Sequence, residues 1–203
     1  MPTSDALIVV EDWISEHFFT TDARKESFQK LVLDRRKQWD SEDIETPRSK
    51  FTKQASKLAT TLAALYSDDL DEASRAGATT QAHEKLLDVL GYLTGEFKTD
   101  PHGPVRFFST AGVDEPALAV VTARPVETHD ELMVKDAPTL TTPWRPSDDA
   151  PDSEEVRSAS RLVSTLFVRE KGPSFALIMA GRWLVVAEKS RWPEGRYLAV
   201  DVQ

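Results

Sequence analysis

The feature that most constrains the fold is an apolar run in the middle of the chain, residues 116–125, with the sequence PALAVVTARP. A short, β-branched run of this kind predicts a strand that is buried on both faces. The prolines at its two ends cannot donate a hydrogen bond to a neighbouring strand, so they mark its limits. Thr122 and Arg124 are its first polar residues. We therefore expect a central strand with polar side chains at its carboxyl end.

The composition describes a chain that can fold around a hydrophobic core. It has 203 residues, of which 40% are hydrophobic and 29% are charged, which is ordinary for a globular protein. No apolar run approaches the roughly 20 residues that cross a bilayer, and the first residues lack the basic, apolar pattern of a secretory signal. Cysteine is absent, which excludes a disulfide framework and a thiolate zinc site. We expect a cytoplasmic protein with no membrane partner.

The first third of the sequence predicts three helices. Apolar residues recur at helical spacing over residues 5–19, 23–39 and 47–66. Residues 67–80 are acidic and small, so we expect an exposed boundary there. The predicted organisation is a helical N-terminal segment over residues 1–70 and an α/β domain over residues 79–203.

Four basic residues lie close together in the third predicted helix. They are Arg48, Lys50, Lys53 and Lys57. Such a cluster can contact the phosphates of DNA, or it can be a solvated helix face. The net charge of −9 argues against strong phosphate-backbone binding by the molecule as a whole, but it leaves room for one basic face.

The second part of the chain predicts a mixed sheet flanked by helices. A helix over residues 81–90 precedes a hairpin (92–98 and 104–110), and the central strand follows it. After a long loop (136–153) and a helix beginning near residue 152, three strands are expected over residues 175–180, 183–187 and 196–202. The fold class is therefore α+β (α/β), a helical lead-in followed by a mixed sheet. Because the last strand has no residues after it to form a cap, we expect the chain to be part of a longer protein.

From Gln81 onward, this order of elements resembles the PD-(D/E)xK nuclease-like fold. The hairpin turn Ala180-Gly181-Arg182-Trp183 is similar to a segment of type I and type IIG restriction enzymes. Three runs together resemble the N-terminal region of actinobacterial fused restriction–modification (type IIG-like) adenine-specific DNA methyltransferases. These runs are residues 11–17 (EDWISEH), 83–92 (HEKLLDVLGY) and 181–198, which begins GRW and ends RWPEGRYL.

The resemblance implies a role in restriction–modification and phage defence, with DNA and the remaining methyltransferase and target-recognition domains of the same chain as partners. The full-length protein would use S-adenosylmethionine. The methylase motif Asn-Pro-Pro-Tyr cannot lie in these residues because the sequence has no asparagine. The resemblance therefore places the methylase beyond Gln203, and no cofactor is expected in this part of the protein.

The nuclease pattern itself is incomplete. Phosphodiester hydrolysis with Mg²⁺ uses acidic metal ligands and usually a lysine. The resemblance makes Asp114 the first acid, puts Thr122 in place of the second and Arg124 in place of the lysine, with Glu84 as an accessory acid. Threonine is not an anionic ligand, and arginine stays protonated. Mg²⁺ is expected only if this site is active, and we predict no other metal site.

Three functions remain open from the sequence. We expect a degenerate nuclease-like module that engages DNA or docks against other domains. The alternatives are an active Mg²⁺-dependent DNA endonuclease domain and a protein–protein docking domain without a DNA role.

Overall fold

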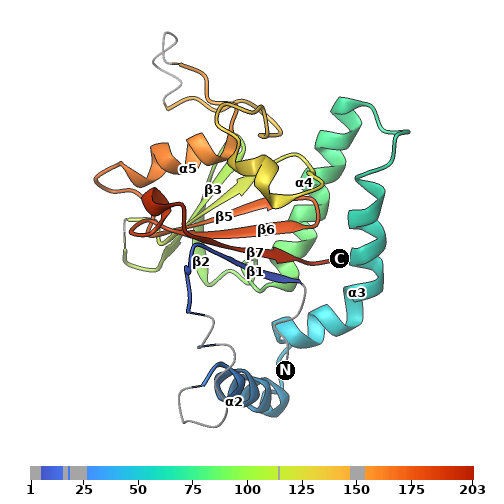
Figure 1. Ribbon diagram of the computed structural model, residues 1–203. Helices are drawn as coiled ribbons and strands as arrows, with labels where there is room; N and C mark the ends of the chain where they lie inside the picture. Colours follow the sequence, from blue (N-terminus) through green and yellow to red (C-terminus); the bar gives the residue numbers. More distant parts are fainter. Residues whose placement is uncertain (1–5, 16–17, 19–26, 114, 147–153) are drawn as a thin grey trace.

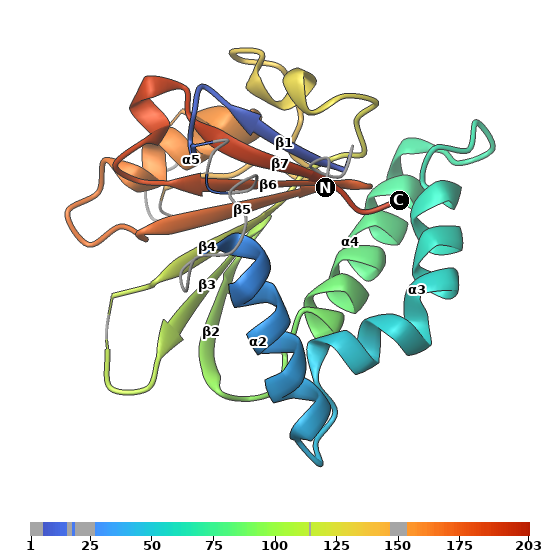
Figure 2. The same ribbon diagram turned by 60° about the horizontal axis from the view of Figure 1, so that its bottom comes forward.

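The protein is described here by a computed structural model that covers residues 6–15, 18, 27–113, 115–146 and 154–203. A single mixed sheet of seven strands forms its centre, with helices on both faces (Figure 1). Helices α3 and α4 cover one face and α5 covers the other, whereas α2 projects away from the sheet (Figures 1 and 2). The α+β class expected from the sequence is confirmed.

The strand order across the sheet is β1-β7-β6-β5-β4-β3-β2. The β4–β5 pair is parallel, and the other neighbouring pairs are antiparallel. The chain passes from β4 to its parallel neighbour β5 through α5, as parallel pairing requires a crossover. The strands are β1 (Leu7–Val10), β2 (Phe97–His102), β3 (Val105–Thr110), β4 (Leu118–Thr122), β5 (Phe175–Ala180), β6 (Trp183–Glu188) and β7 (Tyr197–Asp201).

Four α-helices and two short 3₁₀ helices complete the described residues. The α-helices are α2 (Phe28–Ser41), α3 (Pro47–Ala64), α4 (Glu72–Val89) and α5 (Ala159–Phe167), and the 3₁₀ helices are η1 (His129–Met133) and η2 (Trp192–Glu194). Each α-helix begins after a polar cap whose side chain accepts a backbone N–H of the first turn. The caps are Ser27, Thr46, Asp71 and Ser158. None of these helices is long and apolar enough to cross a membrane.

The central strand β4 is buried on both faces, as its sequence predicts. Val120 packs into the core that the sheet forms with α3 and α4. Ala119 and Val121 point the other way, into the core beneath α5. The strand ends before Pro125, and its carboxyl end brings Thr122 to the face covered by α4.

The helix expected over residues 5–19 is wrong over residues 6–15, which contain no helix. Residues 7–10 form strand β1 instead, which pairs antiparallel with β7 in the register Leu7↔Val200 and Val10↔Tyr197. Ile8 and Val10 pack against the core beneath α5. The sequence LIVV favours a strand because β-branched side chains fit a pleated surface, and this outweighs the helical spacing of the more distant apolar residues.

The start of the next predicted helix, at residue 81, is also wrong, because α4 begins at Glu72 and contains most of residues 67–80. Asp71 caps the helix by accepting the Ser74 N–H at 2.8 Å, and Thr79 is buried inside it. The side chain of Arg75 reaches back to backbone carbonyls at the end of α3 and in the turn after it, at Leu65, Ser67 and Leu70. The segment is therefore a tight helical corner. The division into segments 1–70 and 79–203 remains a prediction, although α3 and α4 share one core with the sheet.

Smaller differences concern where elements begin. The second predicted helix begins at Phe28, and residues 19–26 lie outside the described residues. The helix expected near residue 152 begins at Ala159, because Val156 forms a β-bridge with Trp144 instead. The first hairpin turns at residues 103–104, later than expected, so that β2 includes Pro101. Proline is tolerated there because β2 is an edge strand.

Candidate functional site

A pocket of about 430 Å³ opens between α4 and the carboxyl end of β4. It is the place where the sequence predicts polar groups. α4 supplies one wall, β3 and β4 supply the floor, and the loop after residue 140 closes the side. Its polar lining residues include His83, Glu84, Arg106, Thr122, Thr141 and Thr142.

The carboxylate of Glu84 is held by an arginine from the neighbouring strand. Arg106 Nη1 donates to Glu84 Oε2 at 3.1 Å, and Arg106 Nη2 donates to Glu84 Oε1. Arg106 reaches α4 because strand residues alternate between faces: Val105 and Phe107 point beneath α5, so Arg106 points to α4. The ion pair is part-buried and bidentate, a geometry in which arginine neutralises a carboxylate well. Glu84 is therefore already occupied by a cation of the protein itself.

Thr122 and Arg124 occupy the end of β4, but they face different neighbours. Thr122 lines the pocket of Glu84, and its backbone carbonyl accepts the Thr141 hydroxyl at 3.2 Å. Arg124 lines an adjacent pocket, where it pairs with Glu72 at 2.6 Å and donates from Nε to the Leu140 carbonyl at 3.1 Å. The structure thus places Arg124 outside the pocket of Glu84.

His83 lies beside Glu84 on α4 and is fully buried. Its Nε2 accepts the backbone N–H of Gly181 at 3.2 Å, so the proton of the neutral ring is assigned to Nδ1. Nδ1 has no hydrogen-bond partner among the described residues. Burial lowers the pKa of His83 to about 3, because a charged imidazolium would lose its hydration there. The ring is therefore neutral near pH 7.

The third predicted acid, Asp114, lies outside the described residues. Within the part of the chain that the structure describes, no three histidine, aspartate or glutamate side chains gather into a group that could hold a metal ion. The arrangement around Glu84 can present hydroxyls and one neutralised ion pair to a ligand.

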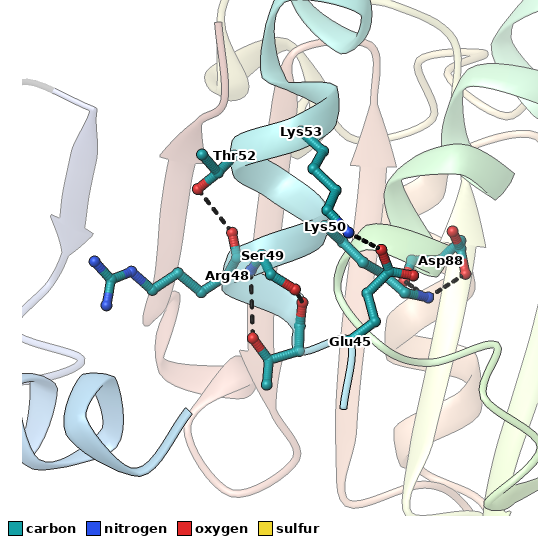
Figure 3. A network of polar contacts seen from close by, with 8 residues as sticks. Glu45, Arg48, Ser49, Lys50, Thr52, Lys53 and Asp88 are labelled. Atoms are coloured by element: carbon teal, nitrogen blue, oxygen red, sulfur yellow. Dashed lines mark hydrogen bonds and ion pairs between the residues drawn. The ribbon is translucent and has the colours of Figure 1, made fainter. Parts of the chain in front are cut away.

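Three of the four predicted DNA-contacting residues on α3 have acidic partners. Figure 3 shows these three, Arg48, Lys50 and Lys53, with the acidic partners of the two lysines. Lys50 is nearly buried and bonds Asp88 of α4 at 2.7 Å. Lys53 bonds Glu45 at 2.8 Å and lowers the pKa of that carboxyl through the hydrogen bond and its charge. Arg48 bonds Asp40, also at 2.8 Å.

Lys57 is exposed and has no ion pair in the described residues. Three of the four positive charges in the cluster are therefore neutralised by acidic side chains, which the sequence alone does not reveal. Lys50 in particular joins two helices, which is a structural role.

Sequence reasoning missed Arg106 and the contacts of His83. The alternation of strand residues 105–108 assigns Arg106 to the same face as Phe108, but which helix covers that face depends on the strand order of the whole sheet. The Gly181 contact of His83 joins residues 98 positions apart, and no local pattern encodes such a pair. Thr141 and Thr142 come from the long loop, and the sequence did not predict where this loop lies in the fold.

No family model matches this chain, and it matches neither a curated protein nor a solved structure. The pocket is accordingly interpreted from its own chemistry.

Proposed function

We propose that the chain is the N-terminal region of a restriction–modification-type, adenine-specific DNA methyltransferase. In this proposal it is a nuclease-like module that engages DNA or docks against the other domains and does not cut. The order α4-β2-β3-β4-α5-β5 supports the nuclease-like part, because a helix, a three-stranded antiparallel meander, a crossover helix and a parallel strand follow one another in that fold.

The observation that carries the proposal is the chemistry at the carboxyl end of β4. A Mg²⁺ site for phosphodiester hydrolysis needs more than one carboxylate at the metal. Here Thr122 is neutral, Arg124 is paired with Glu72, and Glu84 is neutralised by Arg106. The same groups can still accept and donate hydrogen bonds to a bound chain. Binding without cleavage is therefore the activity that this pocket supports best.

Nicking of supercoiled plasmid in the presence of Mg²⁺ or Mn²⁺ tests the absence of cleavage. We expect no metal-dependent nicking by the chain. Nicking that requires the metal and disappears in both Glu84→Ala and Asp114→Ala would show an active endonuclease and overturn the proposal.

The length and content of the open reading frame test the connection to a methyltransferase. The proposal requires an open reading frame that continues past codon 203 into a segment with an S-adenosylmethionine-binding loop and an Asn-Pro-Pro-Tyr-type motif. A stop codon directly after Gln203 would contradict it. Methylation of adenine by the full-length protein with S-adenosylmethionine would support it.

A protein–protein docking domain without a DNA role is the second candidate, and α2 favours it. No residue of this helix is buried, and Leu31 and Leu33 each expose about half of their surface. Ile44 and Phe51, just beyond α2, are exposed as well. Exposed apolar side chains of this kind can pack against a partner protein. No detectable DNA binding at low salt would favour this second candidate.

A further inference from the structure

We propose that a basic groove on the α5 face of the sheet binds the backbone phosphates of a DNA strand. The basic groove lies between the β2–β3 hairpin and residues 169–173, which follow α5. It is on the opposite face of the sheet from the pocket of Glu84. The choice of DNA as the ligand rests on the proposed function, whereas the position of the contact does not follow from it.

Both walls of the basic groove carry cations. Lys98 projects from β2, and Arg169 and Lys171 come from the segment after α5. The space between them is about 280 Å³, enough for phosphate groups but too small for a folded partner. Cations on two walls match a strand that lies along the groove with its phosphates between them.

These cations are available to a ligand. Lys98, Arg169 and Lys171 form no ion pair in the part of the chain that the structure describes. The guanidinium of Arg169 is held over the ring of Trp144 at 5.1 Å, which keeps the charge in place without neutralising it. In contrast, three of the four basic residues on α3 are paired with acids.

The backbone around the groove is also held in place. Lys189 Nζ donates to the Arg169 carbonyl at 3.0 Å, which anchors the segment after α5 to the end of β6. Proline at position 173 is buried and restricts the backbone at the start of β5. A groove with fixed walls loses less conformational entropy when it binds a ligand.

Aromatic rings lie next to the cations. Phe107 forms part of the floor, and the exposed ring of His102 packs edge-on against it, with 5.9 Å between their centroids. Asp100, the acid that lines the groove, bonds His102 at 3.1 Å and forms no ion pair with a lysine among the described residues. Cations beside an accessible aromatic face are the combination that single-stranded nucleic acid uses, phosphates on the cations and bases against rings.

Acidic residues weaken the electrostatic attraction between DNA and the groove. Glu170 is exposed between the two cations of the α5 side, and the molecule carries a net charge of −9. Long-range attraction of DNA is therefore weak, and binding depends on direct contact in the groove. Affinity should fall steeply as salt increases, because each phosphate contact releases counterions.

The experiment uses fluorescence anisotropy with a labelled single-stranded oligothymidylate of about 16 nucleotides, titrated with the chain over a series of salt concentrations. The test variant is Lys98→Glu/Lys171→Glu. The control is Lys85→Glu/Lys135→Glu, which makes the same change in net charge at two exposed lysines without ion pairs, away from the groove. Circular dichroism verifies that all three proteins are folded.

We expect the test variant to bind at least about tenfold more weakly at low salt, with a shallower salt dependence, and the control to bind within about twofold of the unmodified chain. An equal loss of DNA affinity in both variants would show a general charge effect and contradict binding in the groove. Unchanged DNA binding by the test variant would contradict binding in the groove, but it would be consistent with DNA binding elsewhere on the chain. No binding by the unmodified chain would refute DNA engagement itself, and the groove with it.

Discussion

At the scale of single residues, the turn between β5 and β6 joins the helical layer to the sheet. The Gly181 N–H donates to His83 of α4 at 3.2 Å, and the Arg182 N–H donates to the Tyr66 hydroxyl, also at 3.2 Å. The same hydroxyl donates to the Val126 carbonyl at 3.0 Å. Backbone groups that would otherwise be unsatisfied in the interior are paired by these side chains. The turn is therefore a point where small chemical changes have large effects.

His83 should make the protein sensitive to mild acid. Its pKa is about 3 in the folded protein, against about 6.5 in an unfolded chain. The unfolded state therefore binds a proton first, and stability falls as the pH decreases below 6.5. Each pH unit in that window costs up to about 1.4 kcal/mol. Urea unfolding at pH 7 and pH 5 should show this loss.

The variant His83→Gln isolates the contribution of this group. Glutamine keeps an acceptor for the Gly181 N–H but cannot take up a proton. We expect its stability to change less between pH 7 and pH 5 than that of the unmodified chain. An equal change in both proteins would assign the acid sensitivity to other groups.

Gly181 should be intolerant of a side chain. Its φ is +64°, and a Cβ there would approach the Tyr66 hydroxyl to 2.5 Å. Gly195 is the matched control, because its φ is +75° and nothing lies within 4 Å of its Cβ position. Each change to alanine carries about 1–2 kcal/mol of backbone strain, and Gly181→Ala adds about 1–3 kcal/mol of overpacking. Equal losses of unfolding free energy in the two variants would contradict this account.

At the scale of elements, the sequence predicted best where a single pattern governs a segment. β4, β5, β6 and β7 and helix α3 lie where their apolar runs and turn residues place them. The start of α4 was missed because residues 71–80 contain acids, glycine and alanine that read as a loop. The helix forms there because Asp71 caps it and Arg75 satisfies carbonyls of the preceding turn.

β1 was missed for a different physical reason. Its partner β7 lies at the other end of the sequence, and the choice between strand and helix for a short apolar run is decided by the surface on which it packs. In the candidate site, too, the sequence could not predict a contact between residues from different elements. Glu84 was identified from its place on a helix before the central strand, whereas its partner Arg106 depends on which strand lies under that helix.

At the scale of the whole molecule, one core joins α3 and α4 to the sheet. Leu58 and Leu62 of α3 pack in the same cluster as Val120 of β4 and Leu177 of β5. If that core stabilises both layers, α3 cannot detach without exposing the face of the sheet beneath it. The helical layer and the sheet should then behave as one cooperative unit.

Hydrogen exchange followed by mass spectrometry measures this cooperativity. We expect peptides from α3 to show protection similar to that of peptides from β4 and β5, and to lose it at the same urea concentration. Peptides from α2 serve as the internal contrast, since no residue of α2 is buried. Loss of protection in α3 well before the strands would support a separable N-terminal segment.

The pairing of the first strand with the last has a consequence for biosynthesis. Val200, the partner of Leu7, is added to the growing chain 193 residues after it. At a translation rate of about 5–20 residues per second, the apolar LIVV segment waits roughly ten to forty seconds for its place in the sheet. During that interval it is a hydrophobic strand without a neighbour. The nascent chain therefore exposes to chaperones the backbone edge that pairs with β7 in the finished protein.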